Sequence, residues 1–190
     1  MAYLVGIAGG TASGKSTFSD QLRKLLCELG WNVKILHMDH YFRPENERPF
    51  TEAFISGKKY MDDNHPLTVD LDTLKNDIQI NIEEGEYDVI IVEGLLTLWD
   101  NEIYHKLDLR IYIDCKSDER IVRRIKRNME WGLTLEQITN VYLDMVRYRH
   151  DEYVEPSKWR AEIIINGSHS TKASLQMIKE YINVNCRKGK

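Results

Sequence analysis

One short stretch near the N-terminus constrains the fold of this chain more than any other feature. Residues 9–17 read Gly-Gly-Thr-Ala-Ser-Gly-Lys-Ser-Thr and match the phosphate-binding pattern G-x-x-x-x-G-K-[ST]. An apolar run at residues 3–8 precedes the stretch, and residues 18–29 carry leucines at helical spacing. Because this pattern works between a strand and a helix, the order predicts a phosphate-binding loop, or P-loop, that holds a nucleotide.

The residue types of the predicted P-loop suit a polyphosphate. Its glycines let the backbone turn so that successive N–H groups face the ligand, and the N-terminus of the following helix adds the positive end of its dipole. Lys15 is predicted to reach the outer phosphates as a catalytic cation, Ser16 to coordinate Mg²⁺, and Thr17 to bond an inner phosphate. The predicted nucleotide-binding residues are Gly9, Gly10, Thr11, Ala12, Ser13, Gly14, Lys15, Ser16 and Thr17.

The length and charge of the chain limit the class of protein that it can be. Its 190 residues suit a single α/β domain over residues 1–190 with a small lid. The net charge of -4 argues against nucleic acid as an obligatory partner. No apolar run approaches the roughly 20 residues that span a bilayer, so we expect a cytoplasmic protein with no membrane partner. The three cysteines form no C-x-x-C pair, which favours reduced, buried thiols over disulfides or a zinc site.

Apolar runs alternate with helical patterns along the rest of the chain. Besides the first strand, strands are predicted over residues 33–38, 87–92, 109–114 and 161–166. Such alternation predicts an α/β fold with a parallel sheet, helices on both faces, and ligands at the carboxyl ends of the strands. Residues 40–66 break the pattern with prolines and a glycine, so this segment is predicted to be a long loop that is either functional or disordered.

Two acidic residues stand at the ends of predicted strands. Asp39 closes the second strand, and Glu93 closes the third. Phosphoryl transfer from a magnesium nucleotide needs one carboxylate to hold the metal and another to accept the proton of the acceptor. We therefore assign Glu93 to the metal shell, through water, and Asp39 to the catalytic base, close enough to help place the ion. Either acid taken alone could instead cap a strand or a helix.

Four arginines recur at helical spacing between residues 116 and 135. They would share one helix face, apolar residues would occupy the other, and no acidic residue on the basic face would offset them. A solvated basic face is one interpretation. Because the chain is acidic overall and carries a polyphosphate site, we favour a lid that neutralises charge on the transferred group. Arg123 and Arg127 are then catalytic, and Arg120 and Arg124 bind the nucleotide.

The turn of this predicted lid also has a sequence signature. Gly132 supplies a turn, and the residues from Thr134 to Gln137 form a capping box that begins the next helix. The lid is therefore predicted to be a helix, a turn and a second helix.

Several segments occur together in the order of a known family. They are the P-loop, the arginine helix, and residues 38–42 (Met-Asp-His-Tyr-Phe), 64–66 (Asn-His-Pro), 92–96 (Val-Glu-Gly-Leu-Leu) and 155–158 (Glu-Pro-Ser-Lys). The chain resembles the uridine kinase family, in the superfamily of phosphoribulokinase and nicotinamide riboside kinase. The resemblance covers nearly the whole chain. It implies a P-loop NTPase fold with a five-stranded parallel sheet, ATP or GTP with Mg²⁺ as donor, a primary hydroxyl such as the 5′-OH of uridine or cytidine as acceptor, and a homo-oligomer.

The resemblance also implies an acceptor site, and here the chain departs from the family. Residues 82–86 run almost directly into the next strand, so the β-hairpin that reads the pyrimidine in uridine kinases is missing. The Arg-Gly-Arg turn of the lid reads Trp-Gly-Leu at residues 131–133, and an expected glutamine is Val141. Asn64 replaces a ribose-binding aspartate for which the adjacent Asp63 could substitute, and Phe42 replaces a tyrosine. The candidate acceptor-binding residues are Asp39, Phe42, Asp63, Asn64 and His65.

Three functions remain open on these grounds. The first is a kinase that phosphorylates a nucleoside, and the second is a kinase for another acceptor, such as nicotinamide riboside or a sugar. The third is a regulatory nucleotide-binding NTPase that has lost its acceptor. A GTPase switch is disfavoured because the chain has no N-K-x-D tetrapeptide.

Overall fold

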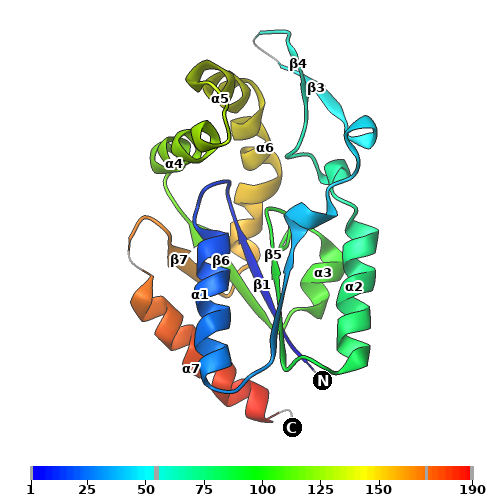
Figure 1. Cartoon of the computed structure of the whole chain (residues 1–190), viewed down its shortest axis with the longest axis vertical. Helices are drawn as coiled ribbons and strands as arrows, with labels where there is room; N and C mark the ends of the chain where they lie inside the picture. The colour runs from blue at the N-terminus through cyan, green and yellow to red at the C-terminus, as the bar shows by residue number, and fades with distance from the viewer. Residues whose placement is uncertain (1, 54–55, 170, 189–190) are drawn as a thin grey trace.

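The computed structural model describes residues 2–53, 56–169 and 171–188 (Figure 1). Five parallel strands form its main sheet in the order β2-β5-β1-β6-β7, which confirms the predicted α/β fold. The strands are β1 (Tyr3–Gly9), β2 (Val33–His37), β5 (Val89–Glu93), β6 (Leu109–Asp114) and β7 (Ile163–Asn166).

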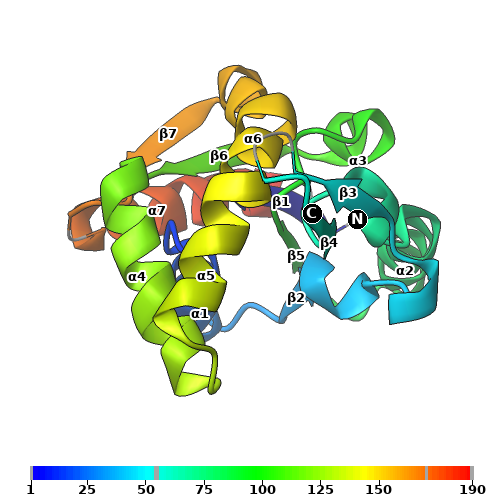
Figure 2. The same ribbon diagram turned by 90° about the horizontal axis from the view of Figure 1, so that it is seen from above.

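Helices cover both faces of this sheet, as Figures 1 and 2 show. The residues that they bury form two hydrophobic clusters, one on each face. α1 (Lys15–Glu28) and α7 (Lys172–Lys188) pack on one face, and α2 (Leu71–Glu84) and α3 (Asn101–Lys106) pack on the other.

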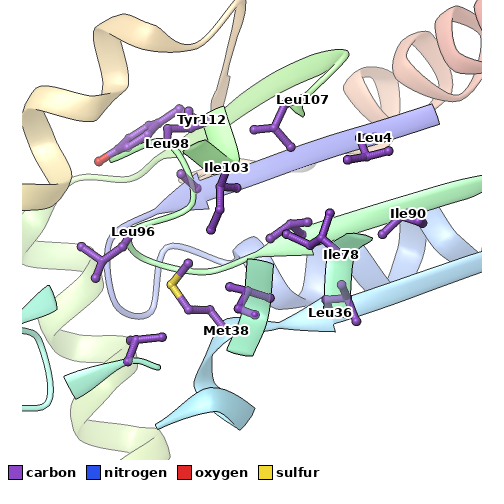
Figure 3. Packing of buried hydrophobic residues seen from close by; sticks show 14 of the residues in the cluster. Leu4, Leu36, Met38, Ile78, Ile90, Leu96, Leu98, Ile103, Leu107 and Tyr112 are labelled. Carbon is purple, nitrogen blue, oxygen red and sulfur yellow. The ribbon is translucent and has the colours of Figure 1, made fainter. Parts of the chain in front are cut away.

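Strand residues alternate between these two clusters. Leu4 and Ile90 point to the face covered by α2 and α3, as Figure 3 shows, while Val5 and Ile91 point to the face covered by α1 and α7. All five residues of β5 are buried, as expected for a central strand of a parallel sheet covered on both faces. Burying each large aliphatic side chain contributes about 1.5–3 kcal/mol, so this core holds the carboxyl edge of the sheet in place.

The predicted loop over residues 40–66 has more structure than its sequence pattern indicates. Its central part forms an antiparallel hairpin of β3 (Phe50–Glu52) and β4 (Lys59–Met61), flanked by short 3₁₀ turns. The hairpin that the sequence predicts to be missing would lie between α2 and β5. Residues 85–88, all of them described, connect these two elements directly and form no strand. The structure therefore has no hairpin between α2 and β5, as the sequence predicts, and has one earlier in the chain, at β3 and β4.

The predicted helix–turn–helix is present. α4 (Ser117–Glu130) is followed by a turn in which Gly132 has a φ of 89°, and α5 (Leu135–Val141) begins at the predicted capping box. We call residues 117–141 the helical arm. Residues 142–160 continue as π-helical and 3₁₀ turns around the short α6 (Arg147–Arg149), and we call them the return helix.

The arm turns its basic face inward, which the pattern of apolar residues does not predict. Arg120 and Asn128 are the buried residues of α4, whereas Val122 and Met129 are 50% and 52% exposed. Leu29, the last leucine of the helical pattern at residues 18–29, is also exposed because α1 ends at Glu28 and the chain turns at Gly30.

The structure tests two expectations drawn from composition, one about the cysteines and one about membrane-spanning segments. The three cysteines, all within the described residues, form no disulfide; Cys115 and Cys186 are buried but Cys27 is exposed, so the expectation of a buried thiol is wrong for Cys27. Among the described helices, none has the length and apolar character that crossing a bilayer requires.

A buried ion pair fastens the β3–β4 hairpin to the return helix. The fully buried carboxylate of Asp62 accepts hydrogen bonds from Arg149 Nε at 2.7 Å, Thr51 Oγ1 at 2.6 Å and the N–H of Asn64 at 3.2 Å. We expect Asp62→Ala to lower the free energy of unfolding by about 3 kcal/mol, because it leaves the guanidinium of Arg149 without its buried partner. Urea denaturation measures the change.

Asp63→Ala is the matched control for this prediction. The Asp63 side chain is about half exposed, and its ion pair with Arg48 at 3.1 Å lies at the surface, so its loss is expected to cost under about 1 kcal/mol. Equal effects of the two substitutions would contradict the structural role of Asp62.

Candidate active site

The P-loop connects β1 to α1 at the carboxyl edge of the sheet. Ala12 and Gly14 have left-handed backbones, with φ of 58° and 99°. At Gly9 a Cβ would lie 2.7 Å from the carbonyl oxygen of Ile113, so only glycine fits against the neighbouring strand. The loop therefore has the strand, turn and helix context that its sequence predicts, and the N–H groups at the start of α1 are available to an anion.

Lys15 and Glu93 meet beside this loop. The two side chains are almost fully buried, and Lys15 Nζ lies 3.5 Å from Glu93 Oε1. The register of β5 against β1 places Glu93 opposite Ile7, two residues before the P-loop begins at Gly9. A residue that the sequence analysis did not select completes the group: His37 Nδ1 lies 2.8 Å from Glu93 Oε2, because β2 pairs these two positions in register.

Asp39 and Lys15 line one cavity of about 610 Å³, which we call the main cavity. Asp39 is placed there by a 3₁₀ turn that directly follows β2. Arg124 and Arg127 of the arm line the same cavity. Burial lowers the pKa of Arg127, and the Asp39 carboxylate acts in the opposite direction, so the two charges interact across this space.

A second hollow, of about 400 Å³, opens at the mouth of the P-loop, and we call it the loop hollow. Ser16 and Thr17 line it together with Arg123. Lys15 and Arg127 line both the loop hollow and the main cavity, so these two cations stand where the two spaces adjoin.

The four arginines of the arm do not form a uniform solvated face. Arg120 is buried, donates from Nε to the carbonyl of Cys115 at 3.0 Å, and lies so close to Gly10 that a Cβ there would be 2.4 Å from its Nη1. Arg123 donates to the carbonyl of Gly167 at 3.0 Å and pairs with Glu119 at 3.4 Å. The expectation that no acidic residue offsets the basic face is therefore wrong.

Arg124 and Arg127 are the arginines of α4 that line the main cavity. Arg124 donates to Thr11 Oγ1 of the P-loop at 3.0 Å, and Arg127 stacks on Trp131 with its guanidinium carbon 4.7 Å from the ring centroid. Burial, followed by repulsion from Arg127, lowers the pKa of Arg124. Its buried Nε has no partner among the described residues. Two adjacent guanidiniums with an unsatisfied buried N–H fit an anionic ligand such as a polyphosphate.

The candidate acceptor residues divide into two groups. Phe42, Asp63 and Asn64 line the main cavity. His65 does not: its Nδ1 accepts a hydrogen bond from the N–H of Leu67 at 3.1 Å, and its ring packs edge-on against Tyr153. The structure thus gives His65 a role in shaping the loop before α2.

The main cavity also has lining residues that the sequence analysis did not select. Tyr60 and Met61 come from β4, and Asn128, Gln137 and Ile138 come from the helical arm. The sequence singles out Gln137 only as part of the capping box of α5, not as a cavity residue. Nothing in the local pattern indicates that Tyr60 or Met61 lines a cavity. These residues reach the cavity through tertiary contacts, which spacing along the chain does not encode.

Comparison with known proteins places the chain among kinases. The family described as "Phosphoribulokinase / Uridine kinase family" matches residues 80–174. A uridine kinase of Clostridium botulinum (strain Kyoto / Type A2) is 37% identical over 199 residues, covering 92% of this chain and 93% of that protein. A uridine kinase of Staphylococcus epidermidis (strain ATCC 12228 / FDA PCI 1200) is 33% identical over 193 residues, covering 92% of each chain.

Solved structures share the fold at lower sequence identity. A putative fructose transport system kinase from Silicibacter sp. TM1040 superposes with a TM-score of 0.66 at 17% identity, covering 86% of this chain and 89% of that one. A possible uridine kinase from Bacillus stearothermophilus gives a TM-score of 0.60 at 19% identity, covering 87% and 89%. The chain therefore belongs to the phosphoribulokinase/uridine kinase family and is a P-loop kinase, a phosphotransferase with an alcohol group as acceptor.

Proposed function

We propose that this kinase transfers the γ-phosphoryl group of ATP or GTP to a hydroxyl of a small metabolite, and that the acceptor is a nucleoside. One observation carries the proposal: the main cavity joins the P-loop lysine, Lys15, to the carboxylate of Asp39 and the guanidinium of Arg127. The names of the curated relatives, which are uridine kinases, support the nucleoside as acceptor.

The donor is proposed to lie along the P-loop. Its phosphates would occupy the loop hollow, held by backbone N–H groups, Lys15 and the hydroxyl of Thr17. A further hollow of about 320 Å³ continues past Thr17 toward Gly167 and His169, which offers room for the ribose and base of the donor.

The residues around the P-loop suit Mg²⁺. Ser16 offers an exposed hydroxyl in the loop hollow, and the buried carboxylate of Glu93 stands 3.5 Å from Lys15. Among the described residues, no three His, Cys, Asp or Glu side chains form a metal site of their own; Mg²⁺ in kinases takes most of its ligands from phosphates and water. We propose that Ser16 holds the ion directly and that Glu93 and Asp39 hold it through water. When bound, Mg²⁺ neutralises charge on the phosphates.

The chemical step then follows from the placement of the side chains. The Asp39 carboxylate accepts the proton of the acceptor hydroxyl, whose oxygen forms a bond to the γ-phosphorus. The bond from that phosphorus to the bridging oxygen breaks, and the nucleoside diphosphate leaves. Lys15 and Arg127 stabilise the charge on the transferred group where the two spaces adjoin, and Arg123 acts from the loop hollow.

The domain and lid assignments are part of the same proposal. We propose that residues 1–190 form one kinase domain and that residues 116–135 move as a lid. The inward basic face of α4 supports the lid, because its guanidiniums face the P-loop across the cavity. Expectations of a homo-oligomer, of a cytoplasmic location, and of partners that include neither nucleic acid nor membrane remain predictions.

Uridine itself is less well supported than kinase chemistry. The alignment to the Clostridium botulinum relative runs over 199 positions, more than the 190 residues of this chain, so that relative carries residues that this chain lacks. No hairpin joins α2 to β5. Nicotinamide riboside and sugars therefore stay alternatives to uridine and cytidine as acceptors.

A screen of nucleotide consumption tests the proposed function. ATP and GTP are each supplied with Mg²⁺ and with uridine, cytidine, nicotinamide riboside, pantothenate or a sugar phosphate. The rate of ADP or GDP formation is measured. We expect one of the nucleosides to accelerate it above the rate without acceptor. Hydrolysis at the same rate with every compound would favour a regulatory NTPase.

A further inference from the structure

We propose that the β3–β4 hairpin selects the acceptor of this kinase, and that Asp144 of the return helix is the positioning residue that holds the hairpin in place. The proposal rests on the proposed function and deepens it. Its acceptor class is a hydroxyl-bearing molecule with a flat ring that packs against Tyr60 and Met61.

The hairpin stands above the sheet edge on the side opposite the helical arm (Figure 1). Between the two, the main cavity has Asp39 and Lys15 from the sheet edge as its floor. Tyr60 and Met61 of β4 line it from the hairpin, and Ile138 lines it from the arm. A ligand whose hydroxyl reaches Asp39 would therefore extend its remaining atoms between hairpin and arm.

Asp144 ties the cavity-lining Tyr60 to the return helix. The Tyr60 hydroxyl donates to Asp144 Oδ2 at 2.8 Å, and Ser56 Oγ donates to the same oxygen at 2.7 Å. The hydrogen bond to Asp144 raises the pKa of Tyr60, and the bonds from Ser56 and Tyr60 lower the pKa of Asp144. The tyrosine thus acts as the donor, and its ring is held against the buried cluster of Tyr142, Met145 and Val146.

The base of the hairpin is fixed to the same helix. Thr51 lies opposite Tyr60 in the β3–β4 register, and its Oγ1 accepts a hydrogen bond from Arg149 Nη2 at 2.9 Å. Arg149 also pairs with the buried Asp62, which follows β4 directly. Asp144 holds the hairpin at Ser56 and Tyr60, and Arg149 holds it at Thr51 and Asp62. These contacts fix the positions of Tyr60 and Met61, which form one wall of the main cavity.

The surface of this wall is suited to packing. Tyr60 and Met61 offer a ring and a thioether, and Ile138 and Val141 of the arm offer aliphatic groups. The two amide oxygens of the arm at the cavity are already engaged, since Gln137 Oε1 accepts from the N–H of Thr134 at 2.8 Å and Asn128 Oδ1 accepts from Arg127 Nε at 3.1 Å. The apolar groups of hairpin and arm would therefore select acceptor rings by shape, with Asn64 left as a polar partner at the cavity.

Steady-state kinetics on hairpin variants test the proposal. The probes are D-ribose, which carries no base, and whichever of the two pyrimidine nucleosides, uridine or cytidine, gives the higher kcat/KM. We expect Tyr60→Ala to raise the KM for the nucleoside about tenfold or more, the effect of losing a stacked ring. The KM for ATP, the kcat, and the kcat/KM for D-ribose should stay unchanged.

A set of matched variants tests the positioning role of Asp144. Tyr60→Phe and Asp144→Ala should each raise the nucleoside KM by about fivefold, as for one lost hydrogen bond, and their combination should do no more than either alone. Asp144→Asn keeps an acceptor oxygen and should restore the KM. Ser56→Ala removes the other bond to Asp144 without touching Tyr60 and should leave KM unchanged. Urea denaturation of each variant shows whether it is folded.

The two possible failures are distinguishable. If the wild-type enzyme phosphorylates a nucleoside but folded Tyr60→Ala keeps its nucleoside KM, or loses kcat equally on D-ribose, the hairpin is not the selecting element and this inference is wrong. If Tyr60→Ala behaves as expected but Asp144→Ala has no effect, Asp144 has no positioning role. If the wild-type enzyme phosphorylates no nucleoside at all, the proposed function fails first.

Discussion

Replacing Asp39 with asparagine is expected to lower kcat by about 10²–10⁴-fold, the usual contribution of a general base. Asparagine has the size of aspartate but cannot accept the proton of the acceptor hydroxyl. Asp39 is exposed at the floor of the main cavity, so the fold should be unaffected. Because Asp39 is proposed to reach Mg²⁺ only through water, the affinity for the donor nucleotide should change far less than kcat. Coupled assay of nucleoside diphosphate formation gives kcat, and isothermal titration with ATP gives the affinity.

Asp63→Asn is the matched control, because Asp63 is the other carboxylate that lines the main cavity. It pairs with Arg48 at 3.1 Å and is a candidate acceptor-binding residue, not the proposed base. Its loss should raise the acceptor KM with less effect on kcat. A regulatory NTPase would not need Asp39, so undiminished turnover in Asp39→Asn would contradict the kinase mechanism.

Replacing Arg127 with alanine is expected to lower kcat by about 10²–10³-fold, the range found for removing a donor to transition-state charge. Arg127 lines both the loop hollow and the main cavity, as Lys15 does. The phosphoryl group passes between these two spaces in the proposed reaction, so the guanidinium is placed where charge develops. Arg127→Lys keeps the charge without the planar geometry and should recover part of the rate.

Two further substitutions on α4 serve as comparisons for the effect of Arg127→Ala on kcat. Arg123 lines the loop hollow but not the main cavity and is partly engaged by Glu119 and Gly167. Arg123→Ala should therefore lower kcat by about tenfold, less than Arg127→Ala. Lys126 is exposed on the outer face of the helix and should be neutral on replacement with alanine. If kcat is unchanged in both Arg123→Ala and Arg127→Ala, the basic face of α4 has no catalytic role.

Sequence alone predicted the fold because its signals are local and repeated. Apolar runs such as residues 109–114 mark buried strands, and the glycine-rich loop between a strand and a helix fixes the connection of β1 to α1. The ends of two predicted strands also carried Asp39 and Glu93, and parallel strands bring their carboxyl ends to one edge. The P-loop half of the candidate site follows from these signals.

The other half of the site could not be read in the same way. β3 and β4 have three residues each, too few for an alternating pattern to stand out among prolines and glycines. Tyr60 and Met61 consequently looked like residues of an irregular loop. His37 meets Glu93 only because β2 and β5 pair in register, which is a long-range contact.

The helical arm shows a different limit. The spacing of its arginines correctly separates two faces of α4, and the lid hypothesis turns the basic face toward the nucleotide, whereas hydrophobicity alone would place the apolar face in the interior. Arg120 is buried while Met129 is 52% exposed, because the interior that α4 faces is a polar cavity beside the P-loop. Amphipathic patterns therefore predict which residues share a face, while the polarity of the neighbouring surface decides which face turns inward.

The most direct test of the central claim is the balance between donor consumed and phosphate ester formed. Phosphorus NMR follows ATP, ADP, inorganic phosphate and phosphomonoester in one reaction with Mg²⁺ and the nucleoside that turns over fastest. The arrangement of Lys15, Asp39 and Arg127 around one cavity predicts one phosphomonoester per ADP and little inorganic phosphate. ADP accompanied by equal inorganic phosphate, with no ester formed from any nucleoside or sugar, would contradict it.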